Sequence, residues 1–138
     1  MKKTNRRNNK VKAFNLQEML IVLAIIGILL LIAMPSLMPL ITKAKSTEAQ
    51  LQLKAIYNMQ TTHRYMYSKY SMDFYEIDYE APKTVKDNGQ ANYRYEIIEA
   101  TNNSFKARAE AVTDFDGDGI YNVWEIDQNG NPKQIVKD

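Results

Sequence analysis

The feature that most constrains this 138-residue chain is a sixteen-residue apolar run near its N-terminus, Met19–Met34. As a helix, the run would be about 24 Å long, which is shorter than the roughly 30 Å hydrocarbon core of a membrane. Extending the helix through Pro35 to Ile41 makes the span sufficient. Because such a helix is apolar on all sides, something outside the domain must bury it, either lipid or the same segment of other chains.

The residues before the run are basic, and a single carboxylate stands at its start. Six lysines and arginines and no acid occupy the first twelve residues, and Glu18 directly precedes the run. A charge at the edge of an apolar span is costly unless it finds a partner or lies at the membrane interface, so Glu18 is a functional-site candidate. A secretory signal would need a small-residue cleavage site after the run, and Ile32-Ala33-Met34 is a weak one. A signal anchor with its N-terminus in the cytoplasm explains the run but not Glu18.

The junction Ala13-Phe14-Asn15-Leu16-Gln17-Glu18, followed by the apolar run, resembles the class III leader of type IV pilins and type II secretion pseudopilins. This resemblance implies that a prepilin peptidase cleaves between Ala13 and Phe14 and that Phe14 is then N-methylated. Pro35 stands where pilins carry a proline that kinks the first helix. The chain departs from the pattern at Ala13, where glycine is usual, and at Asn15, where threonine or serine is common.

The resemblance also implies a homo-oligomeric helical filament, built by an inner-membrane assembly platform from subunits that wait in the membrane lipid. The precursor would cross the inner (cytoplasmic) membrane once, with its N-terminus inside, before entering an extracytoplasmic filament in the periplasm or at the cell surface. In that filament Glu18 would pair with the amino group of Phe14 on a neighbouring subunit. Two opposite charges in an apolar bundle each offset the cost of burying the other. A glutamate among lipid headgroups is the alternative.

Charge and composition narrow the function. The chain has 18 basic and 16 acidic side chains, a net charge of +2, and removing the six basic residues of the leader leaves 12 against 16, or −4. The mature chain therefore gives no reason on charge to expect nucleic-acid binding. There are no cysteines, hence no disulfide. We expect no enzyme activity, because no nucleophile–base pair or phosphate-binding glycine loop is present. The single histidine, His63, is expected to be solvated.

Helical spacing continues beyond the apolar run and predicts one helix from about Leu16 to Tyr70. The helix is expected to bend at Pro35, with Pro39 a second candidate position, because a proline removes a backbone hydrogen bond. We divide the chain into a cleaved leader, 1–13, a transmembrane and polymerisation helix, 14–41, and a globular head, 42–138. The buried face of the helix is expected to carry the apolar positions Leu37, Ile41, Ala44, Leu51, Ala55, Met59, Thr62 and Met66.

Four later segments alternate in polarity and predict strands: 93–98, 105–111, 120–126 and 133–137. Asn129-Gly130 predicts a hairpin turn between the last two. Period-two spacing gives each strand one buried face, which the amphipathic half of the helix can cover. The predicted fold class is α+β, a long kinked N-terminal helix packed on a small antiparallel sheet. Pilin heads have the same architecture.

The segment from Asp114 to Glu125 has the spacing of a twelve-residue calcium loop. Three carboxylates so close together would repel one another without a cation, and hard oxygen ligands favour calcium, the expected cofactor. The flanking pattern is strand-like, unlike that of an EF-hand, and a solvated hairpin turn is the alternative. If Trp124 and Ile126 face the core, Glu125 points away from the ion. The candidate ligands are Asp114, Asp116 and Asp118, then Asn122 and Glu125.

Two functions remain in view. The first is a subunit of a type IV filament, either a pilus pilin or a secretion pseudopilin. The small cysteine-free head and the acidic loop slightly favour a pseudopilin. A tyrosine-rich surface supports a pilus pilin almost as strongly. The second is a signal-anchored monomer whose calcium-loop domain binds a ligand outside the membrane and does not polymerise.

Overall fold

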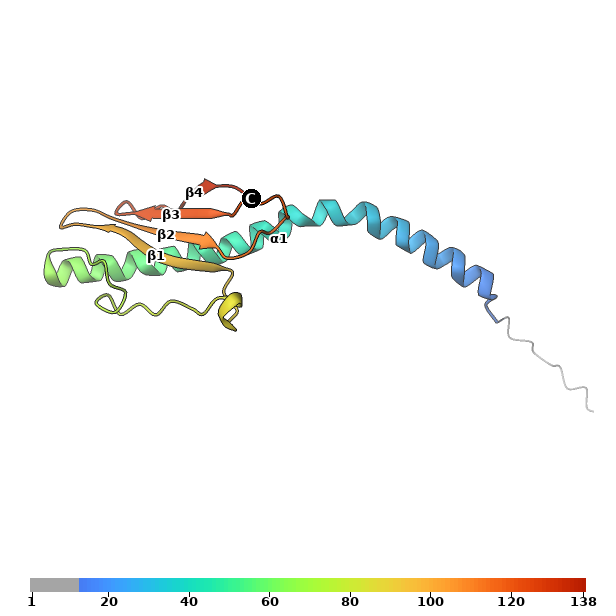
Figure 1. Ribbon diagram of the computed structural model, residues 1–138, viewed down its shortest axis with the longest axis horizontal. Coiled ribbons are helices and arrows are strands. Elements are labelled where there is room, and N and C mark those ends of the chain that lie inside the picture. The colour runs from blue at the N-terminus through green and yellow to red at the C-terminus, as the bar shows by residue number, and fades with distance from the viewer. Residues whose placement is uncertain (1–12) are drawn as a thin grey trace, which may run out of the picture. The chain divides into compact units, whose positions relative to one another are not determined.

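The computed structural model describes residues 13–138, so all but the last residue of the predicted leader lies outside the described part. One 52-residue helix, α1 (Leu16–Tyr67), opens the chain (Figure 1). A long connection with a single 3-10 turn, η1 (Val85–Asp87), leads from it to four strands. The chain forms two compact units, one ending at Ser36 and the other Leu37–Asp138, and α1 belongs to both. The predicted α+β fold is confirmed.

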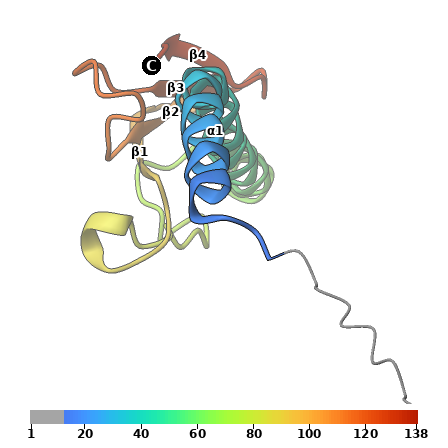
Figure 2. The same ribbon diagram turned by 90° about the vertical axis from the view of Figure 1, so that its right-hand side faces the viewer.

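The strands form one antiparallel sheet in the order β1-β2-β3-β4, each paired with its neighbour in sequence. Their bounds are β1 (Tyr93–Ala100), β2 (Phe105–Ala111), β3 (Val123–Asp127) and β4 (Lys133–Val136). The sheet lies along one side of the part of α1 that belongs to the head (Figure 2). An irregularity between Ile97 and Glu99 shifts the β1–β2 register by one residue.

The core lies between the sheet and one face of α1. Alternate residues of β1 and β2 point into it, as period-two spacing requires. On the sheet the core comprises Tyr93, Tyr95, Ile97, Phe105, Ala107, Ala109, Ala111 and Ile126. On the helix the buried residues are Ser46, Ala49, Leu53, Ile56, Gln60 and His63, which recur at three- and four-residue spacing.

The helix face predicted from apolar spacing is only partly correct in the head, where Ala55 and Met59 pack against the core as predicted. Leu51 and Met66, assigned to the core, are 66% and 64% exposed. Gln60 and His63 occupy the buried face instead, so the expectation that His63 is solvated is also wrong. Counting apolar residues alone selected a face that is rotated away from the one buried in the core.

The buried polar residues of the helix are satisfied by the backbone that follows it. Gln60 donates from Nε2 to the carbonyl of Ser71 (2.6 Å) and accepts the Ser71 N–H through Oε1 (3.0 Å). His63 Nδ1 lies 2.9 Å from the carbonyl oxygen of Lys69. Because a buried polar group costs little once it is hydrogen-bonded, these residues can replace apolar ones in the core.

The helix ends at Tyr67, three residues before the predicted end. Ser68 takes a left-handed backbone (φ 60°), and its N–H donates to the Arg64 carbonyl (2.8 Å). This bond is the αL cap that glycine usually provides. Tyr70 is then held by a backbone bond to Thr101 in the β1–β2 turn (3.0 Å).

Candidate functional site

The first candidate site is the start of α1. Ala13 and Phe14 precede the helix and are exposed. Asn15 caps it: the N–H groups of Glu18 and Met19 donate to its carbonyl (3.0 and 3.2 Å), and its own N–H donates to Glu18 Oε2 (3.0 Å). Glu18 thus supplies the carboxylate half of a capping box, placed where the helix dipole favours negative charge.

The apolar segment that follows is not covered by any other part of residues 13–138. Every residue from Ala13 to Ile41 is exposed, and Glu18 is the only ionisable side chain among them. By length and composition, α1 can cross a membrane, and none of its apolar window is buried. The helix is unbroken at Pro35 and Pro39. The bend expected at Pro35 stays a prediction.

The second candidate site is the acidic loop between β2 and β3. Asp114 organises it, accepting the N–H of Gly117 through Oδ1 and that of Gly119 through Oδ2 (both 2.6 Å). Both glycines have φ near +88°, a conformation that other residues adopt at a cost. Asp116 and Asp118 each accept an N–H two residues further on (3.1 and 2.7 Å). The three carboxylates are thereby held on one turn.

A fourth carboxylate joins them from the end of the described chain. One oxygen from each of Asp114, Asp116, Asp118 and Asp138 lies within 4.8 Å of the others. Asp138 Oδ2 accepts the N–H of Phe115 (2.9 Å), whereas its Oδ1 is buried without a hydrogen-bond partner. Four carboxylates with oxygens at this separation form a group that could hold a metal ion, and such oxygen ligands are the kind that calcium takes.

Two other predicted ligands have different neighbours. Asn122 is fully buried, and its Oδ1 accepts the hydroxyl of Tyr93 (3.1 Å). Glu125 lies on β3, where one carboxylate oxygen accepts from Nε and Nη2 of Arg108 (3.0 and 2.8 Å). The structure therefore brings the three aspartates together. Asn122 lies in the core instead, and Glu125 forms an ion pair with Arg108.

Comparison with known proteins bears on the family resemblance. Over 58 residues, 42% of its length, the chain is 41% identical to the type IV major pilin protein PilA of Myxococcus xanthus. The resemblance to the type IV pilins is confirmed. The match spans only about a quarter (26%) of that relative, and no family model matches the chain. The pilin-like character of the chain thus rests on the 58-residue match, on the long apolar helix and on the small sheet.

The loop of this pilin-like chain has two carboxylates with opposite pKa shifts. The N–H groups of Gly119 and Gly117 stabilise the charged form of Asp114 and lower its pKa. The pKa of Asp116 is raised, by loss of solvent around it and by the charges of Asp118 and Asp138. A cation among the four carboxylates would remove the repulsion that raises the second value.

Asp138 is the candidate ligand that sequence reasoning missed. Its signal was indirect: the predicted Asn129-Gly130 hairpin places the end of β4 beside the start of β3, and Val136 does pair with Val123. Residue 138 therefore returns to the loop that precedes β3. Spacing within one loop cannot reveal a ligand that arrives from another strand.

Proposed function

We propose that this chain is the subunit of a type IV filament, cleaved between Ala13 and Phe14 by a prepilin peptidase and polymerised through its N-terminal helix. The observation that carries the proposal is a helical segment exposed at every position, with one carboxylate at its start. Identity to a major pilin over 58 residues supports the same reading. Before assembly the segment lies in the inner membrane, and an assembly platform transfers it to the filament.

Glu18 sets the register of assembly in this proposal. Cleavage gives Phe14 a free amino group, which is then methylated and remains cationic. On a neighbouring copy this group pairs with the Glu18 carboxylate, so that neither charge enters the apolar bundle alone. The bond from the Asn15 N–H satisfies only one oxygen of the carboxylate, which leaves the other for the neighbour.

Mass spectrometry of the mature N-terminus tests processing. The filament proposal expects a chain that begins at N-methylated Phe14. A chain that retains Met1 would instead identify a signal-anchored domain that does not polymerise.

Substitution of Glu18 tests assembly separately from processing. Glu18→Ala should give a chain that is cleaved normally and accumulates in the membrane, with filaments lost from sheared-cell fractions. Glu99→Ala, which removes an exposed acid of the head, is the matched control and should assemble normally. Wild-type amounts of filament from Glu18→Ala would refute the pairing.

We assign the filament to the pilus class rather than to a secretion pseudopilus, because the relative is a type IV major pilin. Electron microscopy of cells with and without the protein tests the assignment. Long surface filaments that disappear with the gene support it. Their absence, together with loss of a secreted protein, would indicate a pseudopilin.

Calcium is the second part of the proposal. Asp114, Asp116, Asp118 and Asp138 would hold the ion, which would offset the repulsion among them and fix the turn before β3. Calorimetry on the full chain in detergent should detect calcium binding, and Asp138→Asn should weaken it by about tenfold or more. Glu125→Gln is the control and should leave it unchanged. No binding at millimolar calcium, with a melting temperature indifferent to EDTA, would refute the site.

A further inference from the structure

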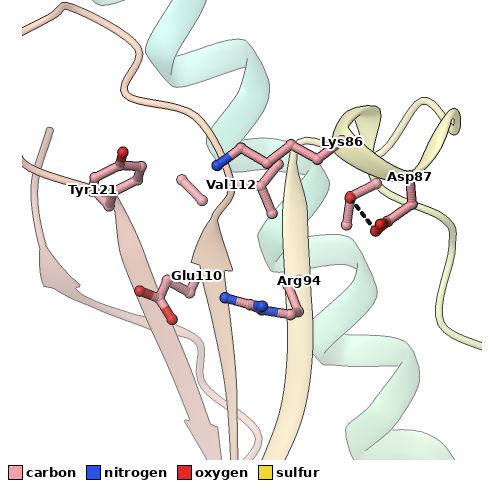
Figure 3. A pocket seen from close by; sticks show the side chains of 8 residues that line it. Lys86, Asp87, Arg94, Glu110, Val112 and Tyr121 are labelled. Atoms are coloured by element: carbon pink, nitrogen blue, oxygen red, sulfur yellow. Dashed lines mark hydrogen bonds between the residues drawn. The ribbon is translucent and has the colours of Figure 1, made fainter.

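The pocket drawn in Figure 3 is lined by charges that balance. Two bases, Lys86 and Arg94, line it, and so do two acids, Asp87 and Glu110. Glu110 lies opposite Arg94 in the β1–β2 register, and the Asp87 carboxylate accepts the Thr84 hydroxyl (2.6 Å). This pocket therefore gives no reason to expect a charged ligand.

Another pocket, of about 220 Å³, is lined by the last turns of α1 and by residues 76–78 of the connection to β1. Its lining includes two acids, Glu76 and Asp78, and none of the described residues around it is a lysine or an arginine. The same lining includes an imidazole, that of His63, and two thioethers, those of Met59 and Met66. Donor atoms and negative charge together favour a cation.

The imidazole and the two thioethers lie on one face of the helix. Met59 precedes His63 by four residues, and Met66 follows it by three. Residues at these separations are neighbours on a helix, with about 5–6 Å between their Cβ atoms. Helical side chains lean towards the N-terminus, so Met66 leans back over His63. The unbranched side chain of Met59 is flexible enough to reach the same space.

The His63 ring is oriented by contacts on its other side. Nδ1 lies 2.9 Å from the Lys69 carbonyl oxygen, which can only accept, so Nδ1 carries the proton of the neutral ring. The lone pair is then on Nε2, which makes no hydrogen bond within residues 13–138 and is not sealed from solvent. The ring also packs on that of Tyr67, with 4.6 Å between the centroids. Metal-binding histidines are commonly held in this way, by a carbonyl on the second ring nitrogen.

Packing in the core does not account for Met66. Its side chain is 64% exposed, although the neighbouring His63 is buried. Met59, by contrast, packs partly against the core. Met66 therefore places an exposed thioether at the pocket that His63 lines.

The donor atoms select the kind of cation. Within residues 13–138, three or more carboxylate or imidazole ligand atoms converge only at the acidic loop, so Glu76 and Asp78 do not complete a site for a hard ion with His63. Thioether and imidazole ligands suit Cu(I), which is a soft ion. The two acids contribute negative potential around the ion.

We propose that His63 Nε2 and Met66 Sδ bind a Cu(I) ion, with Met59 Sδ as the third donor. The site is formed within one copy of the chain, so it does not depend on the proposed filament. It is also separate from the acidic loop, whose oxygen ligands suit calcium.

Competition with bicinchoninate, a coloured Cu(I) chelator, tests the site on the full chain in detergent. The titration is done without oxygen, with ascorbate to keep the metal as Cu(I). Met66→Leu should weaken binding by about tenfold or more, and because Met66 is exposed the head should stay folded. Met72→Leu is the matched control: Met72 is also exposed (56%) but does not line the pocket, so binding should be unchanged. Equal affinities of the wild type and Met66→Leu would overturn the site.

Nuclear magnetic resonance identifies the donor atoms directly. Since His63 is the only histidine, its ring nitrogen signals are unambiguous. Ag(I), which is diamagnetic and prefers the same soft ligands, should shift the signals of His63 Nε2 and of the Met59 and Met66 methyl groups. Nδ1 should stay protonated and the Met72 methyl signal should not move. Metal on Nδ1, or an equal shift of the Met72 methyl signal, would refute the proposal.

Discussion

The two units of this chain differ in the exposure of their apolar side chains. In residues 13–36 every side chain is exposed, although all but a few are apolar. In Leu37–Asp138 the sheet and one face of α1 bury their apolar residues against each other. The first unit lacks partners that the second has. A helix apolar on all sides must obtain them from lipid or from other copies.

The comparison extends to the charged residues. Glu125 has its partner, Arg108, in the same head, and the buried Gln60 has both polar atoms satisfied by Ser71. Glu18 has only one N–H of the preceding turn. The head thus supplies partners for these two side chains, whereas the N-terminal unit leaves its apolar surface and one oxygen of its carboxylate without a partner in the described residues. Four predictions test how sharply this division holds.

The largest effect should come from paired leucine truncations. Leu53 is fully buried in the head, and Leu29 is 61% exposed in the apolar segment. Leu53→Ala should lower the free energy of unfolding of the head by about 2–5 kcal/mol, because it leaves a cavity. Leu29→Ala should leave it unchanged within about 0.5 kcal/mol. Denaturation of the full chain in detergent, followed by the fluorescence of the single tryptophan, Trp124, measures both. Equal losses would contradict the division.

The next effect concerns a buried polar residue. Gln60→Leu removes both partners of the Ser71 backbone and leaves a buried donor and acceptor unsatisfied. We expect a loss of about 2–3 kcal/mol, although leucine is the more apolar residue. Gln50→Leu is the control. The Gln50 side chain makes no hydrogen bond in the described residues, so this substitution should change the free energy of unfolding little. A stabilised Gln60→Leu would show that apolar burial alone holds the head together.

The same residue explains which part of the fold the sequence could predict. Periodicity located α1 and the four strands, because strand alternation and helix length survive local exceptions. The buried helix face was partly misassigned, because Gln60 and His63 are core residues whose partners lie on a connection with no periodic signal. The helix end was also misplaced, since Ser68 caps it where glycine would be expected.

The candidate sites divide in a similar way. The three aspartates of the loop lie in one short segment, so their spacing alone pointed to them, and the Ala13–Glu18 junction was indicated by a carboxylate beside an apolar run and by its resemblance to a pilin leader. Asp138 lies on another strand and comes to the loop through the β3–β4 pairing. Sequence spacing finds sites within one segment, and pairing of strands creates the others.

A smaller effect should come from the ion pair of the head. Glu125→Gln should cost about 0.5–1 kcal/mol, because Arg108 is 37% exposed and partly exposed pairs contribute little. It should leave filament assembly intact. Glu18→Ala should behave in the opposite way, with a stable head and no filaments. Parallel measurements of the free energy of unfolding and of the amount of sheared filament check this contrast. An assembly defect in Glu125→Gln would contradict it.

The smallest effect is a pH dependence of the loop without calcium. The pKa of Asp114 is lowered in the folded chain, so its contribution to stability is complete above the unfolded pKa of about 3.9 and disappears as pH falls through the lower folded value. The pKa of Asp116 is raised, so its ionisation costs stability as pH rises through the same region. In EDTA, Asp114→Asn should therefore flatten the rise in melting temperature between about pH 3 and pH 5, and Asp116→Asn should steepen it. Both carboxylates are solvent-accessible, so we expect the changes in melting temperature to be small. Shifts of the same sign in the two variants would mean that net charge, rather than the hydrogen bonds of Gly117 and Gly119, governs the loop.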